Sequence, residues 1–284
     1  MQERRTVLES KASTLVLRGR SFVWGARTYV MGIINATPDS FSGDGIARDI
    51  EAVRARAAAM VVAGADIIDV GGESTRPGHT PVAENEEMTR IAPVMRALRA
   101  DLKVPISIDT FKPAIAARAV ELGADMVNCV WGALPGIVDV AASSRVPIVI
   151  MHNRADANYE RDVVEGVIDS LARAVAQAKR TGIPSEHIIV DPGIGFGKTA
   201  EHNIEILRRL PELRAKVQYP LLIGTSRKSF IGKVTGLPVE QRAFGTAASV
   251  ALSIAGGADI VRVHDVPEMV AVAKVADAIS RRNG

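Results

Sequence analysis

Cysteine is almost absent from this sequence, because Cys129 is the only one among 284 residues. An internal disulfide framework is therefore excluded, and the composition is typical of a protein kept in a reducing compartment. Long apolar runs are also missing, since no stretch reaches the roughly 18–20 residues of a membrane-spanning helix. Residues 1–11 are charged and lack the apolar segment of a signal peptide. These features predict a cytoplasmic protein without a membrane partner.

Aromatic residues are scarce at 4%, and the formal net charge is only +3. A surface that stacks nucleic-acid bases needs aromatic side chains beside a basic groove, so a nucleic-acid partner is not expected. The basic residues that stand out lie in loops that also contain glycine. That placement predicts a small anionic ligand, which arginine and lysine bind through their N–H groups.

Short apolar segments alternate with amphipathic ones along most of the chain, a pattern typical of parallel strands covered by helices on both faces. Eight such units predict an α/β protein with a (β/α)8 TIM barrel, organised as a single domain over residues 1–284. A pattern at residues 14–24 predicts a short N-terminal β-hairpin that closes the lower end of the barrel. Strands are expected at about residues 29–34, 67–70, 105–108, 126–129, 147–151, 188–190, 221–224 and 260–263. Eight helices are expected between and after them, with 201–210 as one helix and 232–238 as a loop.

An open, doubly wound sheet is the alternative arrangement. That fold more often carries a glycine fingerprint after its first strand, with an acidic residue about 20 positions further on. Here glycine-rich polar loops follow the first, second, sixth and seventh expected strands. This distribution favours a barrel, in which all strand ends form a ring, over an open sheet with one binding crevice where the strand order reverses.

Polar residues at the strand ends are the candidates for chemistry, because the active site of such a barrel lies at that face. We interpret Asp69 by itself as a residue that caps the next helix or fixes a turn. Asp109, Asn128 and Asp191 end three other strands, and we expect them to face one opening with no basic residue to pair with. Such acceptors suit a planar heterocycle that offers several N–H donors.

Basic residues gather at the ends of three other segments. These are Thr75-Arg76-Pro77-Gly78, Ser226-Arg227-Lys228-Ser229 and Arg262-Val263-His264. The first two are also compatible with ordinary exposed turns. Taken together they favour a phosphate or pyrophosphate site at the rim of the barrel, above the acidic groups. The histidines lack zinc-site spacing, and the Gly-Ile-Gly-Phe-Gly-Lys stretch does not have the spacing of a P-loop.

These segments are similar to the signature stretches of the dihydropteroate synthase family, and they occur in the family's order over nearly the whole chain. The matching stretches are Met31–Ser42, Asp69–Gly78, Ser107–Thr110, Asp191–Lys198, Gly224–Ser229 and Arg262–Asp265. The resemblance implies a (β/α)8 transferase of folate biosynthesis, usually a homodimer. Such an enzyme condenses 6-hydroxymethyl-7,8-dihydropterin pyrophosphate with p-aminobenzoate to give 7,8-dihydropteroate and pyrophosphate.

The resemblance also assigns roles to residues. The pterin ring is bound by Asp109, Asn128, Asp191 and Lys228, with Met151 and Phe196 nearby. The pyrophosphate is bound by Thr75, Arg76, Arg262 and His264, and catalysis depends on Arg76, Lys228, Arg262 and His264. Lys228 and Ser229 border the p-aminobenzoate pocket, and the two mobile loops that close over p-aminobenzoate contain Asp39, Ser40, Phe41, Arg76 and Pro77. Asn35 is implied as a ligand of the cofactor Mg²⁺, which would assist a dissociative departure of pyrophosphate.

The sequence departs from the family pattern at Cys129, where the family usually has aspartate, which puts a supporting hydrogen bond near the pterin pocket in question. Two other functions remain open at this point. A corrinoid-linked pterin methyltransferase would need the pterin acceptors but no cations for pyrophosphate. A non-catalytic pterin-binding paralogue is the second alternative.

Overall fold

The computed structural model describes residues 14–36, 46–73 and 82–281. Eight parallel strands form one sheet in the order β8-β7-β6-β5-β4-β3-β10-β9, and a parallel bridge between Val190 and Leu221 closes it into a barrel. The predicted (β/α)8 fold is confirmed. The strands are β3 (Tyr29–Asn35), β4 (Ile67–Gly71), β5 (Ile106–Asp109), β6 (Met126–Cys129), β7 (Ile148–Met151), β8 (Ile188–Asp191), β9 (Leu222–Ile223) and β10 (Ile260–Val263).

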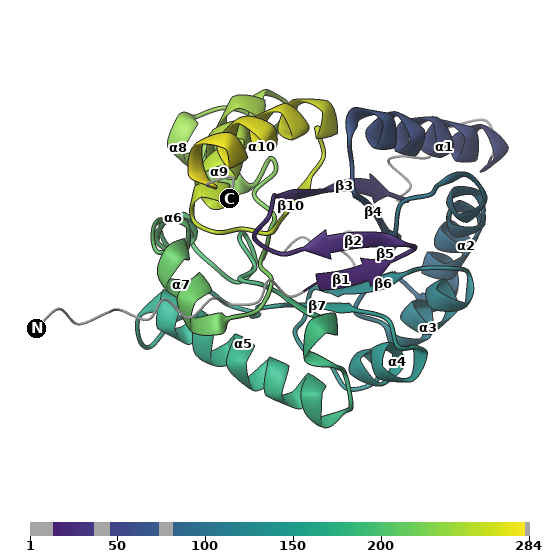
Figure 1. The fold of residues 1–284 in the computed structure, drawn as a ribbon, viewed down its shortest axis with the longest axis horizontal. Coiled ribbons are helices and arrows are strands. Elements are labelled where there is room, and N and C mark those ends of the chain that lie inside the picture. Colours follow the sequence, from purple (N-terminus) through teal and green to yellow (C-terminus); the bar gives the residue numbers. More distant parts are fainter. Residues whose placement is uncertain (1–13, 37–45, 74–81, 282–284) are drawn as a thin grey trace, which may run out of the picture.

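Helices surround the barrel on its outer side (Figure 1). They are α1 (Ile46–Ala63), α2 (Glu84–Asp101), α3 (Pro113–Glu121), α4 (Ile137–Ser144), α5 (Val163–Arg180), α6 (Ala200–Arg208), α7 (Leu210–Val217), α8 (Ser229–Thr235), α9 (Ala243–Ala255) and α10 (Val266–Ser280). Short 3₁₀ turns occur at Ser185–His187 and Val239–Gln241.

Two of these helices differ from the sequence prediction. The expected loop at 232–238 is wrong for residues 232–235, because α8 continues to Thr235, and it is confirmed for 236–238, which follow the C-cap Gly236 with its φ of 74°. The expected single helix at 201–210 is also too simple, since α6 ends at Arg208 and α7 begins at Leu210. Pro211 lies in the first turn of α7, where proline is tolerated because its missing N–H has no helical acceptor.

The hairpin of β1 (Thr14–Leu17) and β2 (Arg20–Val23) closes the lower end of the barrel, as predicted. In Figure 1 it lies across the middle of the ring of strands. Phe22, Trp24 and Tyr29 form an aromatic cluster with ring centroids between 4.7 and 5.9 Å apart. The cluster belongs to a buried core that also contains the inward-facing residues Met31, Ile67, Met126, Val149, Ile189, Leu222 and Ile260. This apolar lower core leaves the opposite end of the barrel for polar groups.

A repeated Gly-Ala-Asp triplet fixes the lower ends of three strand pairs. It occurs at residues 64–66, 123–125 and 257–259, and each glycine has a φ between 99° and 111°, where glycine is favoured. Each aspartate then accepts a backbone N–H near the start of the neighbouring strand at 2.9 Å, in the pairs Asp66–Val30, Asp125–Ile106 and Asp259–Leu221. The triplet therefore sets strand register at the end remote from the polar opening.

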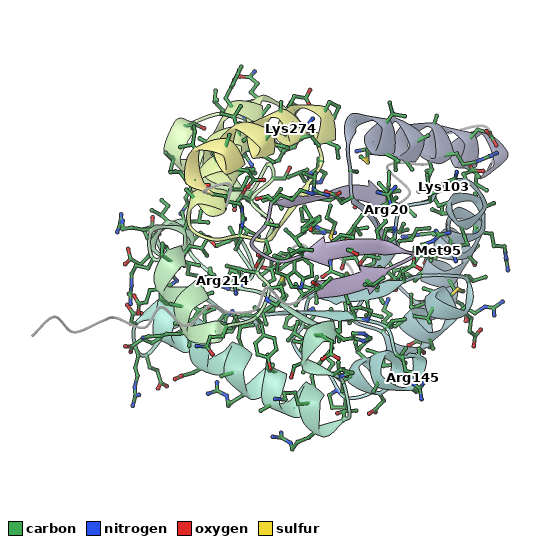
Figure 2. All side chains as sticks on the ribbon, in the orientation of Figure 1. Arg20, Met95, Lys103, Arg145, Arg214 and Lys274 are labelled. Atoms are coloured by element: carbon green, nitrogen blue, oxygen red, sulfur yellow. The ribbon has the colours of Figure 1, made fainter. Side chains whose placement is uncertain are left out.

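Charged side chains cover the outside of the molecule. Arg145, which follows α4, and Lys274 on α10 are exposed and project away from the barrel (Figure 2). Within the described ranges, no helix combines the length and apolar character required to cross a bilayer.

Candidate active site

Strand alternation directs one set of polar side chains towards the interior of the barrel at its upper end. Residues two apart on a strand face the same side, so the polar set follows the inward-facing apolar residues of the lower core. Two positions after Ile67, Met126, Ile189 and Ile260 come Asp69, Asn128, Asp191 and Arg262. On β5 the same face holds Ser107 and Asp109, because Ile106 and Ile108 pack outward. The predicted convergence of Asp109, Asn128 and Asp191 is confirmed.

Arg262 lies between two of these carboxylates. Its Nε donates to Asp69 Oδ2 at 2.6 Å, and its Nη2 donates to Asp109 Oδ2 at 2.6 Å. Asn128 Nδ2 donates to the same Asp69 oxygen at 3.1 Å. The expectation that the acidic groups have no adjacent basic residue is therefore wrong, and Arg262 lies among them rather than only at the rim. Asp69 is fully buried and is no helix cap, because alternation places it on the same face as Ile67.

Three oxygens on the inner wall have no hydrogen-bond partner among the described residues. They are Asp69 Oδ1, Asp109 Oδ1 and Ser107 Oγ. A buried acceptor without a donor costs about 1–3 kcal/mol, and an ionised carboxylate can only accept. A ligand that offers several N–H groups would remove this cost. The wall therefore has the chemistry expected for binding a donor-rich heterocycle.

Burial also controls the protonation of these carboxyl groups. Desolvation raises the pKa of Asp109 to about 7, against the opposing attraction of Arg262. It raises the pKa of Asp191 to about 6, although the N–H of Gly193 and the charge of Lys228 act in the opposite direction. For Arg262, burial alone would lower the pKa, but Asp69 and Asp109 raise it overall. Carboxyl groups that titrate near neutral pH are typical of functional sites.

An apolar patch borders the polar groups. It consists of Val130, Met151 and Phe196, and Phe111 packs against it. Lys228 Nζ lies 3.8 Å from the centroid of the Phe196 ring, a cation–π contact, and its charge acts on the nearby carboxylates of the barrel wall. An apolar surface with a few polar groups is typical of ligand pockets. Met151, Phe196 and Lys228 are thus brought to the acceptors, as predicted.

The glycine-rich loop after β8 is fixed by Lys198. Its Nζ donates to the carbonyl oxygens of Gly193 and Phe196 at 3.0 and 2.9 Å and contacts His152 Nδ1 at 2.9 Å. Burial lowers the pKa of His152 to about 3, so the ring is neutral. Asp191 Oδ1 accepts from the N–H of Gly193 at 2.7 Å. A Cβ on Gly193 would lie 1.9 Å from the carbonyl oxygen of His152, so this position requires glycine.

The last two strand ends are joined by His264. Its Nδ1 lies 3.0 Å from Ser226 Oγ, which follows β9. Arg227 binds Asp265 through Nε at 3.0 Å and through Nη2, a two-pronged contact that fixes the turn before Lys228. Ser229 is exposed in the first turn of α8.

The comparisons with known proteins agree with this geometry. A family model described as pterin binding enzyme matches residues 31–264. A dihydropteroate synthase from Clostridium beijerinckii is 46% identical over 266 residues, which cover 93% of this chain and 98% of that protein. The dihydropteroate synthase from Clostridium difficile, crystallised in the presence of pteroic acid, is 47% identical with a TM-score of 0.89, covering 92% and 100% of the two chains. The Xanthomonas albilineans enzyme with 4-aminobenzoic acid is 42% identical with a TM-score of 0.88, covering 94% and 98%.

The chain belongs to the dihydropteroate synthase family. This membership confirms the resemblance on which the sequence prediction was based, and it confirms the predicted enzyme class, a transferase of folate biosynthesis.

Part of the predicted dihydropteroate synthase site lies outside the described residues, namely Asp39, Ser40, Phe41, Thr75, Arg76 and Pro77. Asn35 is the last residue of β3, and alternation places it on the inward face with Met31. In the described part of the chain, no three His, Cys, Asp or Glu side chains are grouped as a metal site. The roles of all these residues stay predictions.

Cys129 faces away from the inner wall. Its side chain is fully buried in the core between the barrel and the helices. Burial raises the pKa of the thiol to about 11, although the backbone N–H groups of Trp131 and Leu134 at the sulfur act against this. The substitution of the family's usual aspartate therefore changes the outer layer and leaves the side chains of the inner wall in place.

Sequence reasoning missed three contributors to the site of this dihydropteroate synthase family member. Asp69 and Ser107 carry a usable signal, because each lies two positions from a residue already known to face inward, Ile67 and Asp109. Lys198 carries no such signal, since its role depends on tertiary contacts with His152.

Proposed function

We propose that this chain condenses 6-hydroxymethyl-7,8-dihydropterin pyrophosphate with p-aminobenzoate to give 7,8-dihydropteroate and pyrophosphate. The observation that carries the proposal is the inner wall, where oxygens of Asp69 and Asp109 without partners lie with Asn128 and Asp191 beside an apolar patch. The amino-pyrimidinone edge of a pterin presents N–H donors and acceptors that match these groups. A cytoplasmic location, expected from the cysteine content, is part of the proposal.

The chemistry we infer is electrostatic catalysis with positioning. The C–O bond between the pterin methylene and pyrophosphate breaks, and its electron pair leaves with pyrophosphate. The positive charge that remains is delocalised over the pterin until the amine of p-aminobenzoate bonds to the methylene carbon and loses a proton to water. Lys228, Arg262 and His264 would stabilise the negative charge that develops on the departing pyrophosphate, which is the task of fixed charges in a buried site. Arg262 is well suited to it, since two carboxylates hold its guanidinium in one orientation.

Mg²⁺ fits this site as an ion shared with the substrate. In phosphate-handling sites Mg²⁺ is usually held by one or two protein oxygens together with substrate phosphates and water. Asn35 can supply such an oxygen, because its amide is placed at the end of β3 on the inward face. When bound, the ion would neutralise charge on the departing pyrophosphate.

The test is to incubate the purified chain with pterin pyrophosphate and Mg²⁺, with and without p-aminobenzoate, and to measure pyrophosphate and dihydropteroate. We expect equal amounts of the two products, formed only when both substrates are present. A pterin-binding paralogue would bind 6-hydroxymethylpterin without forming either product. A corrinoid-linked methyltransferase would transfer a methyl group from a methylated pterin and leave the pyrophosphate ester intact. Either of these results would refute the proposal.

We also propose that two copies of the chain form a homodimer through α6 to α9. An apolar groove of about 730 Å³ lies there, lined by residues that include Ile204, Leu207 and Phe230. Large apolar side chains are exposed around it, with Phe244 91%, Leu252 69% and Val234 66% accessible. Contiguous exposed apolar surface of this kind marks interfaces. In a twofold dimer each copy offers both the projecting side chains and the groove, so the contacts are made twice.

Phe244→Asp is the test of this interface, with Val62→Asp as its control. Val62 is 89% exposed on α1, outside the groove. Sedimentation of the wild type and the control should show dimers, and Phe244→Asp should shift the population towards monomers. A monomeric wild type, or a Phe244→Asp variant that dimerises like the control, would contradict the proposal.

A further inference from the structure

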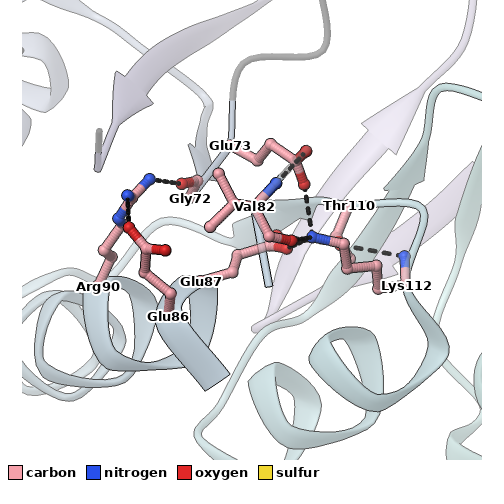
Figure 3. A network of polar contacts seen from close by, with 8 residues as sticks. All are labelled: Gly72, Glu73, Val82, Glu86, Glu87, Arg90, Thr110 and Lys112. Atoms are coloured by element: carbon pink, nitrogen blue, oxygen red, sulfur yellow. Dashed lines mark hydrogen bonds and ion pairs between the residues drawn. The ribbon is translucent and has the colours of Figure 1, made fainter. Parts of the chain in front are cut away.

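A buried polar network lies beside the site, between the ends of β4 and β5 and the start of α2 (Figure 3). Lys112 is at its centre. Its Nζ donates to Glu73 Oε2 at 2.6 Å, to Glu87 Oε2 at 2.7 Å and to the carbonyl oxygen of Val82. These contacts use all three donors of the ammonium group. The side chains of Lys112, Glu73 and Glu87 are only 12%, 3% and 1% exposed.

The network ties together two positions that are nine residues apart in the chain. Glu73 Oε1 accepts the N–H of Val82 at 3.0 Å, while Lys112 binds both the Glu73 carboxylate and the Val82 carbonyl. Both backbone polar groups of Val82 are therefore bound within the network. Residue 73 directly precedes the segment 74–81, and residue 82 directly follows it. One lysine thus holds both ends of that segment.

The same lysine is attached to the pocket. It lies three residues after Asp109, and its own N–H donates to Thr110 Oγ1 at 3.2 Å. Thr110 Oγ1 donates in turn to Glu87 Oε1 at 3.3 Å, and Phe111 packs against the apolar patch of the site. The network therefore connects residues 73 and 82 to the end of β5, where pairing with β4 and β6 and the hydrogen bond from Arg262 hold Asp109 independently of Lys112.

Stability alone does not account for this network. Replacing buried ion pairs with well-packed apolar residues is often neutral or stabilising, because desolvation offsets the attraction between the charges. Here burial acts to lower the pKa of Lys112, and the two carboxylates raise it overall. Burial raises the pKa of Glu87. Burying two carboxylates around one ammonium group therefore carries a desolvation cost. What the arrangement provides in return is a fixed geometry of the three side chains.

We propose that Lys112 is a positioning residue for the reaction. By tying Glu73 and Val82 to the end of β5, it fixes the two ends of the segment that carries Thr75 and Arg76 relative to Asp109. The inference rests on the proposed function, because the roles of Thr75 and Arg76 come from the family resemblance. It predicts a selective defect, in which the coupling of p-aminobenzoate is lost while recognition of the pterin ring is retained.

The test uses Lys112→Met, which keeps the length of the side chain and removes its charge and donors. Initial rates are measured with both substrates present, at a temperature well below the melting temperature of the variant. The affinity for 6-hydroxymethylpterin is measured by calorimetry. We expect kcat/KM for p-aminobenzoate to fall about 30- to 100-fold, since small misplacements of reacting groups cost on this order. The pterin affinity should stay within about twofold of the wild type, and Lys112→Arg should recover much of the loss in rate.

Arg281→Met is the matched control. The Arg281 side chain is 14% exposed, binds Asp277 and donates to the carbonyl oxygen of Gly25 at the lower end of the barrel. The Arg281→Met substitution should lower the melting temperature and leave kcat/KM unchanged. Equal kinetics in the Lys112 and Arg281 variants would overturn the inference, as would a loss of pterin affinity that parallels the loss of rate. Should Lys112→Met fail to fold, Glu73→Gln is used, and it should show the same selective defect. A wild type that forms no dihydropteroate refutes the proposed function, which is a different result.

Discussion

Replacing Asp109 by asparagine tests whether its carboxylate binds the pterin. The variant keeps the size of the side chain and an oxygen that can accept from Arg262 Nη2, which lies 2.6 Å from Asp109 Oδ2. It removes the negative charge and replaces one acceptor oxygen by an N–H₂ donor. A donor in that place would face the N–H groups of the pterin. We therefore expect weaker binding of 6-hydroxymethylpterin.

The expected magnitude follows from the charge on the carboxylate. A hydrogen bond to a charged group contributes about 1.5–3 kcal/mol, so the dissociation constant should rise roughly 10- to 100-fold at pH 8. Because burial raises the pKa of Asp109 to about 7, the wild type itself should weaken as the pH falls. The ionised fraction drops from about nine-tenths at pH 8 to about one-tenth at pH 6, which predicts about tenfold weaker binding at pH 6.

The measurement is calorimetric titration of 6-hydroxymethylpterin at several pH values between 6 and 8. In this range the Asp191 carboxyl, with a pKa of about 6, changes its ionised fraction by at most about twofold. The wild type should lose about tenfold or more in affinity towards pH 6, and Asp109→Asn should lose no more than about twofold. Glu51→Gln on the exposed face of α1 should follow the wild type. An asparagine variant with the same pH dependence as the wild type would refute the assignment.

Three further predictions concern stability. Burial raises the pKa of Asp109 to about 7 in the folded protein, so between the unfolded-state pKa of about 4 and this value the unfolded chain releases the proton more readily, and the wild type loses stability as the pH rises. The melting temperature of Asp109→Asn relative to that of the wild type should therefore be higher at pH 8 than at pH 5.5. An equal difference at the two pH values would contradict this. Gly193→Ala should fold poorly or lose pterin binding because its Cβ would meet backbone at 1.9 Å, whereas Gly182→Ala, which also has a positive φ but nothing within 4 Å, should lose only about 1–2 kcal/mol. Asp259→Ala removes acceptors for two backbone N–H groups and Asp125→Ala for one, so denaturant titration should give a larger loss of unfolding free energy for Asp259→Ala, by about 1–3 kcal/mol.

The sequence was sufficient to predict the barrel, because apolar strands and polar strand ends follow a period that can be counted. The same counting places Asp109 and Asn128 in one opening. It did not reveal that Arg262 reaches across from β10 to Asp69 on β4, since the two residues are 193 positions apart and β10 and β4 both pair with β3. An arginine at a strand end therefore predicts only a rim residue, although its side chain is long enough to bind the carboxylates below.

Local patterns also failed where tertiary packing decides the structure. The Ser229–Thr235 segment was expected to be partly loop, but Phe230 and Ile231 are buried, and burial of apolar side chains stabilises a short helix that propensity alone would not. Lys112 and Lys198 look like ordinary basic residues in the sequence. Their roles follow only from the carboxylates and carbonyl groups that surround them in the fold.

Aspartates at the two ends of the barrel show how position decides what a carboxylate does. At the lower end Asp66, Asp125 and Asp259 accept backbone N–H groups, and this fixes the strands in register. At the upper end Asp69 and Asp109 are buried as well, yet each keeps one oxygen for which no described residue provides a donor. Unsatisfied buried acceptors lower the free energy of unfolding. The hydrogen bonds of the lower aspartates therefore have to offset the cost of leaving the upper oxygens without donors until a ligand binds. The N–H groups of that ligand then recover, on binding, the free energy that folding left unrealised.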